Sequence, residues 1–461
     1  MSPVPCPVCF LEVPGAELVA ARSVDRDTLR LVAGNAPGWR VSQGLCDACL
    51  GRFETARVAL RDERPHWAPG ALPILPTALR LGAPAEYRGR GVSIAFLDAG
   101  FFAHPDLVAS KDRILRYLDV NDPGARRGDL DRISESSWHG MMTSTVACGD
   151  GALSGGFYHG LACEARLVLV KVGSARRILH DDIRRGLDWV IRHRRQYAIR
   201  VVNVSCGGDY EASYLADRLS QSVERATKEG LVVCCAVGNQ GDAPGHPVLP
   251  PGSAPSALTV GGLDDQNRLA FAGFRMYHSS YGPTVDGLQK PDLIAPGIFI
   301  AAPVLPGTPA AERVALLARL AQAPDRELLP LLEESPGVDP ELDAGRRLPA
   351  HALRGLVKKR LRDENVVSAH YKHVDGTSFA APIVASLAAL MLEANARLTP
   401  QELKHILVRT ARRIPGADPS RQGFGVVDAA AAVAEAVKRR PAQKAAEVIP
   451  FKPSNRRTPP P

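Results

Sequence analysis

Short apolar runs alternate with amphipathic stretches through the middle of the chain, from about residue 77 to about residue 302. The runs are almost continuous in apolar residues, which is typical of parallel strands covered on both faces. Five of them predict strands: residues 92–97, 167–170, 201–204, 231–237 and 258–260. Apolar residues at helical spacing before Gly230 predict a helix that ends at this glycine. The order predicts an α/β fold, a doubly wound parallel sheet with helices on both faces.

A segment rich in Leu, Ala, Glu and Arg interrupts this pattern at residues 303–371. Its apolar residues are spaced for short helices, which we expect to be broken by Pro324, Pro330 and Pro336, so we predict a helical insertion. The chain then divides into a small cysteine-bearing module at 1–70, a large α/β domain at 71–437 that contains the insertion, and a basic, Pro-rich, disordered tail at 438–461.

The composition is that of a globular protein, with 461 residues of which 45% are hydrophobic and 23% charged. The longest uncharged stretch, residues 376–392, contains Pro382 and is shorter than a membrane span requires, so we predict no membrane association. The first residues have neither the basic nor the apolar region of a secretion signal, which predicts a cytoplasmic protein.

The net charge of +8 raises the question of an acidic partner such as nucleic acid. Residues 438–461 carry +6 of that charge, which leaves only +2 for the rest of the chain. The basic tail holds a single aromatic residue, Phe451, and lacks the repeated aromatic residues that stack on bases, so the charge argues against nucleic acid.

Four of the nine cysteines form two Cys-x-x-Cys pairs near the start of the chain: Cys6, Cys9, Cys46 and Cys49. Four thiolates suit a tetrahedral zinc ion, and four protein ligands would close the site, so we predict structural zinc in a ribbon-like module. One redox-active pair, or four merely buried thiols, are the alternatives. The other five cysteines lie in apolar surroundings as small hydrophobic residues.

Three residues at the predicted ends of strands and starts of helices carry candidate chemistry. Asp98 follows the first apolar run directly, while His139 and Ser378 lie where helices are expected to begin. A serine nucleophile needs a base, and the base needs a group that holds its tautomer. Each residue alone also has an ordinary explanation, as a turn residue, a satisfied histidine or a helix cap.

Two further strand ends strengthen the functional interpretation. Asn239 follows the run at 231–237, where its amide could donate to the oxyanion of a tetrahedral intermediate. The small residues Ser205, Cys206 and Gly207 follow the run at 201–204 and form an edge with which an extended peptide could pair.

Together these residues make the chain similar to the subtilisin-like serine peptidases. Eight segments match the signatures of that family in order: LDAG at 97–100, HPDL at 104–107, HG at 139–140, VNVSCG at 202–207, AVGN at 236–239, SSYGP at 279–283, KPDLIAPG at 290–297 and GTSFAAP at 376–382. The resemblance leaves out residues 1–70, the insertion and the tail.

The resemblance implies peptide-bond hydrolysis through an acyl-enzyme, with Ser378 as nucleophile, His139 as general acid and base, and Asp98 as the group that orients His139. Asn239 and the Ser378 backbone N–H would stabilise the oxyanion. The edge at Ser205, Cys206 and Gly207 would bind the substrate strand, and the segment Ala236, Val237 and Gly238 would form the wall of the first specificity pocket.

Two positions depart from the family pattern, since Ala99 and Met141 stand where hydroxyl residues are usual. His104 and His373 are rival imidazoles, and we predict that neither is catalytic. His104 lies in a segment that is a structural turn in the family, and His373 lies beside Ser378 without a helix-initiating context. The Pro-bearing strip at 72–77 is a candidate for a segment that lies across or near the active-site edge and is removed on activation.

The sequence therefore predicts an intracellular serine endopeptidase that acts on proteins or peptides. The alternative is an inactive scaffold of the same fold that binds protein partners through the module or the insertion. Calcium often accompanies the family, but no cluster of oxygen ligands in the sequence assigns a site for it.

Overall fold

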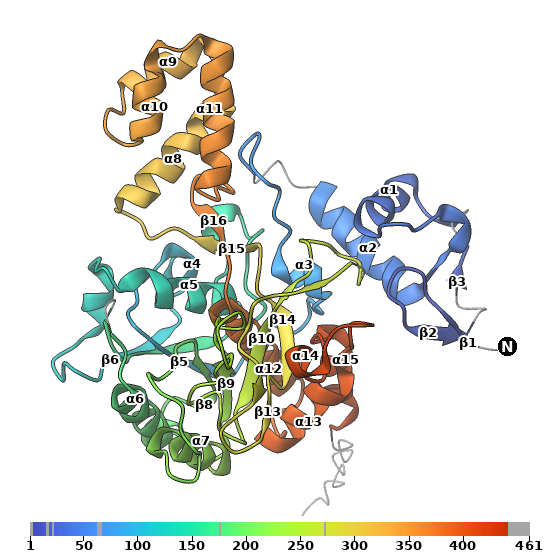
Figure 1. Ribbon diagram of the computed structural model, residues 1–461, viewed down its shortest axis with the longest axis vertical. Coiled ribbons are helices and arrows are strands. Elements are labelled where there is room, and N and C mark those ends of the chain that lie inside the picture. Colours follow the sequence, from blue (N-terminus) through green and yellow to red (C-terminus); the bar gives the residue numbers. More distant parts are fainter. Residues whose placement is uncertain are drawn as a thin grey trace, which may run out of the picture.

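The computed structural model describes residues 3–14, 18–20, 23–61, 67–174, 177–271 and 273–440. Most of the tail predicted to be disordered, residues 441–461, lies outside the described residues. Three parts can be distinguished in Figure 1: an α/β body, a group of helices that projects from it, and a small module built from the first residues.

The body is organised around an eight-stranded sheet in the order β11-β10-β9-β8-β5-β7-β6, with β14 paired to β10. All neighbouring pairs are parallel except β10 with β11. The strands are β5 (Ser93–Asp98), β6 (Ile114–Asp119), β7 (Arg166–Lys171), β8 (Ile199–Val204), β9 (Val232–Ala236), β10 (Leu258–Asp264), β11 (Arg275–Met276) and β14 (Leu293–Pro296). The five predicted strands are all present, and the predicted doubly wound α/β fold is confirmed.

Helices cover both faces of this sheet. Along β5, Ile94 and Phe96 belong to the core that contains α12, whereas Ala95 and Leu97 belong to the core beneath α6 and α7. The helices of the body are α3 (Thr77–Leu81), α4 (Pro105–Val108), α5 (Ser137–Cys148), α6 (His180–His193), α7 (Arg218–Lys228), α12 (Thr377–Ala394), α13 (Pro400–Thr410), α14 (Pro419–Gln422) and α15 (Ala429–Lys438).

Helix α12 runs through the centre of the body and packs against β8, β9 and β10. Among the described residues it is the one helix whose length and apolar composition would also suit a membrane span, but 89% of it is buried. Since α5, α15 and the central strands pack around it, its apolar character is that of a central core helix.

The insertion is helical, as predicted, and stands on a two-stranded antiparallel ribbon (Figure 1). The ribbon consists of β15 (Ile300–Pro303) and β16 (Tyr371–Val374), and the helices are α8 (Pro309–Gln322), α9 (Leu328–Glu333), α10 (Pro340–Ala344) and α11 (Ala350–Asp363). The prediction that Pro330 breaks a helix was wrong. Pro330 lies in the first turn of α9, where a helix does not use the backbone N–H that proline lacks.

The first residues form a small module of strands and two helices beside the body (Figure 1). Its elements are β1 (Pro3–Pro5), β2 (Glu12–Pro14), β3 (Leu18–Val19), α1 (Arg26–Asn35), β4 (Leu45–Cys46) and α2 (Asp47–Arg61). The apolar core of the module includes Phe53 and continues into Leu263, Phe271 and Ile294 of the body. The module is therefore packed firmly on the body.

The remaining short elements are the strands β12 (Gly282–Pro283) and β13 (Gln289–Lys290) and the 3-10 helices Val41–Gln43, Arg127–Asp131, Ala152–Ser154, Asp325–Glu327 and Gly345–Arg347. Parallel strands have their carboxyl ends at one edge of the sheet, so the residues that follow β5, β8 and β9 lie along the same edge.

Candidate active site

Asp98 and His139 are in direct contact at this edge. Asp98 is the last residue of β5 and is fully buried, and His139 lies in the first turn of α5. Nδ1 of His139 is 2.7 Å from Oδ1 of Asp98. This short contact fixes the orientation of the imidazole ring and leaves its Nε2 atom directed away from the carboxylate.

Two more donors converge on the same carboxylate. The backbone N–H of Ala99 donates to Oδ1 at 2.7 Å, and the hydroxyl of Thr143 donates to Oδ2 at 3.0 Å. The sequence analysis missed Thr143. The missing hydroxyls at Ala99 and Met141 therefore do not leave Asp98 without support, because a buried threonine one turn further along α5 supplies a hydroxyl.

The environment of His139 has opposing effects on its pKa. Burial favours the neutral ring and lowers the pKa, but the negative charge of Asp98 and the hydrogen bond to it outweigh this effect. The pKa of His139 therefore lies above the ordinary value for histidine, which favours the protonated ring.

Ser378 lies in the first turn of α12, two residues after Gly376. Gly376 has φ 144°, a value that favours glycine, so it provides the turn from β16 into the helix. The hydroxyl of Ser378 donates to the carbonyl of Ser205 at 3.2 Å, and the Ser205 hydroxyl donates to the carbonyl of Ser378 at 2.8 Å. The next residue, Phe379, has its ring centroid 6.0 Å from that of His139, so the start of α12 and the start of α5 meet.

Asn239 follows β9 and contacts the same turn. Its Oδ1 atom accepts hydrogen bonds from both the backbone N–H and the hydroxyl of Thr377, each at 2.9 Å. Since Oδ1 takes these two donors, the amide is held in one orientation and Nδ2 is the atom left to bind a ligand. Nδ2 faces Gly376, 3.9 Å from the point where a Cβ atom on that glycine would lie.

A cavity of about 200 Å³ lies beside Ser378 and Asn239. All six residues predicted for the substrate edge and the pocket wall line it: Ser205, Cys206, Gly207, Ala236, Val237 and Gly238. Further lining residues, among them Gln240, Leu249 and Ser280, come from loops that the sequence analysis did not assign to the pocket. No lining residue carries a charge.

The thiol of Cys206 contacts the backbone of β5. Its Sγ atom contacts the carbonyl of Leu97 at 3.7 Å, and burial raises its pKa well above the ordinary value. The two rival imidazoles lie outside the constellation of Asp98, His139 and Ser378. His104 is fully buried as the cap of α4, and burial lowers its pKa to about 3. His373 belongs to β16 and packs against Phe299.

The four paired cysteines come together in the module. Cys6 and Cys9 lie between β1 and β2, and Cys46 and Cys49 lie in β4 and the first turn of α2. Their sulfur atoms all lie within 4.8 Å of one another, with 3.9 Å between Cys6 and Cys49 and 3.8 Å between Cys9 and Cys46.

The geometry and chemistry of this cluster fit a zinc ion. With Zn–S bonds of about 2.3 Å, a tetrahedral site has sulfur atoms about 3.8 Å apart. The backbone N–H of Cys46 also points at the sulfur of Cys6, at 3.4 Å, as is typical of a site that stabilises thiolate.

The model of the subtilase family matches residues 89–425 of this chain. The chain therefore belongs to the subtilase family, the class of subtilisin-like serine endopeptidases.

The chain is similar to several known proteases. It is 31% identical over 356 residues to the serine protease AprX of Bacillus subtilis, covering 74% of this chain and 66% of that protein. It is 31% identical over 162 residues to the major intracellular serine protease of the same organism, covering 34% of this chain and 45% of that protein. Among solved structures, a protease of Pseudoalteromonas arctica PAMC 21717 matches with a TM-score of 0.51 and 26% identity, over 78% of this chain and 93% of that chain.

Proposed function

We propose that this chain hydrolyses peptide bonds with Ser378 as nucleophile, His139 as general base and then general acid, and Asp98 as the group that holds His139. The observation that carries the proposal is the 2.7 Å contact from His139 Nδ1 to Asp98, made at the point where α5 meets the first turn of α12. Nδ1 is occupied by the carboxylate, so Nε2 is the atom available to take the serine proton.

In this mechanism the Ser378 hydroxyl turns from the Ser205 carbonyl towards His139 as the substrate binds. The serine oxygen attacks the scissile carbonyl, and His139 passes the proton to the leaving amine. His139 then takes a proton from water, the water oxygen attacks the acyl-enzyme, and His139 returns the proton to the departing Ser378 oxygen. Asp98 keeps its charge throughout and stabilises the imidazolium.

The oxyanion of the tetrahedral intermediate would be stabilised by Nδ2 of Asn239 and the backbone N–H of Ser378. The two hydrogen bonds from Thr377 to Oδ1 support this role, because they orient Nδ2 before the substrate arrives. The N–H of Ser378 belongs to the first turn of α12, where helical N–H groups lack partners within the helix and the helix dipole favours negative charge.

The substrate would lie as an extended strand along Ser205, Cys206 and Gly207. The side chain before the scissile bond would enter the neighbouring cavity. An uncharged lining and a volume of about 200 Å³ favour an uncharged side chain of moderate size at this position.

A fluorophosphonate probe tests the proposed function, because it reacts with activated serine nucleophiles. The full-length protein should form one adduct, which peptide mass spectrometry should locate at Ser378. An adduct at any other serine, or none with folded protein, would contradict the proposal. The inactive scaffold is not favoured, since relatives over most of the chain are serine proteases.

We also propose that Cys6, Cys9, Cys46 and Cys49 hold one structural zinc ion. Four sulfur ligands would close its coordination shell, so the metal would fix the module and take no part in hydrolysis. A cytoplasmic location agrees with this site, because none of the nine cysteines is paired in a disulfide.

The zinc proposal predicts a metal content of about one zinc ion per chain. Replacing Cys6 and Cys49 together by serine should remove the metal and lower the melting temperature by a few degrees, because the module then loses the link between its two halves. Cys163→Ser is the matched control, since Cys163 is buried but outside the cluster, and it should keep the zinc. If wild-type protein from which the metal has been removed melted at the same temperature as untreated wild-type protein, a structural zinc site would be ruled out.

Binding of a protein partner at the module or the insertion stays a prediction. The absence of a nucleic-acid partner also stays a prediction, and so does calcium, for which no site is assigned.

A further inference from the structure

Residues 67–82, here called the linker segment, join the module to the body and lie outside the part of the chain that matches the subtilase family. The strip at 72–77 was predicted to lie across or near the active-site edge, and none of its residues lines the cavity beside Ser378. Ile74 is fully buried in a cluster with Phe157, Tyr158 and Tyr371. Its carbonyl accepts hydrogen bonds from the hydroxyl of Tyr158 at 2.9 Å and from the indole of Trp67 at 3.1 Å.

Asn267 also forms hydrogen bonds with the backbone of this strip. Its Oδ1 atom accepts from the backbone N–H of Leu75 at 2.9 Å, and its Nδ2 atom donates to the carbonyl of Pro73 at 2.7 Å. The linker segment is therefore held by buried apolar contacts and by backbone hydrogen bonds, which is unlike a segment poised for removal.

The linker segment ends in α3, whose Arg80 has a fully buried side chain. Its guanidinium forms a two-pronged ion pair with Asp265, at 2.8 Å from Nε and 2.6 Å from Nη2. The same group donates to the carbonyls of Ile298 at 2.8 Å and Phe299 at 2.6 Å. Only the planar fork of an arginine can make these four bonds at once.

The loop held by Arg80 in turn holds the residues before the nucleophile. The backbone N–H of Gly376 donates to the carbonyl of Gly297 at 2.7 Å, and the N–H of Phe299 donates to the carboxylate of Asp375 at 3.0 Å. Ser378 follows Gly376 by two residues. A continuous series of hydrogen bonds therefore leads from Arg80 through residues 297–299 to the turn that carries Ser378.

Resting on the proposed function, we propose that Arg80 is a positioning residue for Ser378 and that the linker segment stays attached in the active enzyme. Arg80 fixes the loop at 297–299, the loop fixes Gly376, and Gly376 sets where the serine oxygen lies relative to His139. The substrate edge lies after β8 and the pocket wall lies at the end of β9. None of the hydrogen bonds between described residues joins either of them to this loop. Loss of Arg80 therefore affects the chemical step more than substrate binding.

The test uses two variants of the full chain. Arg80→Lys keeps the charge but cannot make the four bonds, and the double variant Arg80→Gln with Asp265→Asn avoids leaving a buried carboxylate without a partner. For the folded protein, kcat on a peptide substrate should fall at least about tenfold with KM within about threefold, because misplacing a reacting atom mainly slows the chemical step. The rate of fluorophosphonate labelling should fall by the same factor. A folded variant with kcat within twofold of wild type would overturn the proposal.

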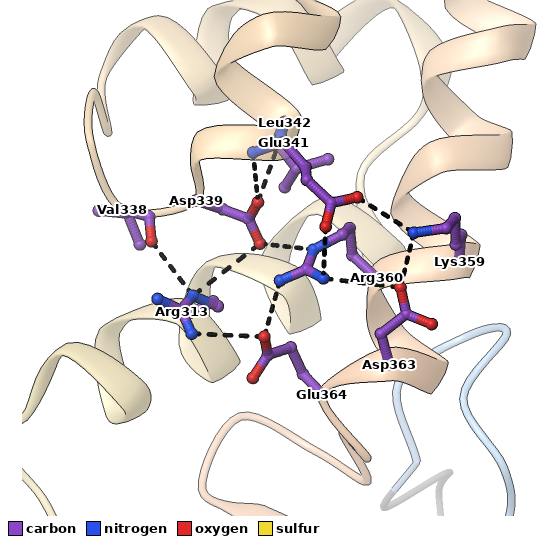
Figure 2. A network of polar contacts seen from close by, with 9 residues as sticks. All are labelled: Arg313, Val338, Asp339, Glu341, Leu342, Lys359, Arg360, Asp363 and Glu364. Atoms are coloured by element: carbon purple, nitrogen blue, oxygen red, sulfur yellow. Dashed lines mark hydrogen bonds and ion pairs between the residues drawn. The ribbon is translucent and has the colours of Figure 1, made fainter.

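The insertion supplies a matched control, shown in Figure 2. Arg360 of α11 pairs with the buried Asp339 at 3.0 Å and with Glu341 and Glu364, so it is also a buried arginine bonded to several acceptors. Arg360→Gln with Asp339→Asn should lower the melting temperature but leave kcat unchanged. If this control loses kcat as strongly as the Arg80 variants do, the effect is general destabilisation and the positioning role is wrong.

The proposal also predicts that the active enzyme keeps the linker segment. The intact mass of the fluorophosphonate-labelled wild-type protein should include residues 67–82. Labelled protein that begins after residue 82 would overturn the proposal. Wild-type protein that is not labelled at all would instead contradict the proposed function, so the two failures can be told apart.

Discussion

Replacing Ser378 with alanine should lower kcat by about 10⁶-fold, the loss typical of removing the nucleophile from a serine triad. Alanine removes only the oxygen that would attack the substrate. The first turn of α12, with Gly376 before it and the Thr377 bonds to Asn239, does not depend on that oxygen. The substrate should therefore still bind, and KM should change little. Steady-state hydrolysis of a fluorogenic peptide measures the effect, and the fluorophosphonate adduct should disappear.

Ser386 provides a matched control in the same helix. It is fully buried, and its hydroxyl donates to the carbonyl of Ile383 within α12. Ser386→Ala removes the same atom from the same helix, away from His139, and kcat should stay within about twofold of wild type. If Ser378→Ala retained more than about a hundredth of the activity, a different residue would be the nucleophile.

The catalytic candidates could be predicted from the sequence because their segments resemble the family signatures in order, although each residue alone had an ordinary explanation. Asp98 directly follows a continuous apolar run, and Asn239 follows another. Parallel strands bring their carboxyl ends together, so local strand predictions were enough to place these two residues at one edge. The cysteine cluster was predicted in the same way, from two short repeats of one spacing.

The side chains that hold these residues in place were harder to predict. Thr143 lies four residues after His139 in α5, so the two share one face of the helix, and this spacing is a signal that the sequence analysis could have used. Arg80 and Asp265 offer no such signal. They are separated by 185 positions, and only the packing of α3 against the end of β10 brings them together.

The path of the linker segment shows the same limit. Its prolines predicted an extended strip, which is correct, but not the surface on which the strip lies. That surface consists of Tyr158, Asn267 and Tyr371, which come from three distant parts of the chain. Tertiary contacts of this kind follow from how elements pack, and no local pattern encodes them.

Replacing Asp98 with alanine should lower kcat by about 10⁴-fold and move the pH dependence of activity. The pKa of His139 lies above its ordinary value because the charge of Asp98 outweighs burial. Without the carboxylate, burial acts alone, so the pKa of His139 falls. Since the base must be neutral, the acid limb of kcat/KM should move to lower pH in the variant. A pH profile of kcat/KM measures the shift.

The control for Asp98 is Asp119, which is also a buried carboxylate near the carboxyl end of a strand of the same sheet. Its partner is the ammonium group of Lys171 at 2.9 Å and not an imidazole. Asp119→Ala should therefore cost some stability while leaving the acid limb in place, because the pKa of His139 depends on Asp98. If the acid limb of Asp98→Ala stayed at the wild-type pH, the limb would report a group other than His139. If it moved to higher pH, the carboxylate would not be the group that raises the pKa of this histidine.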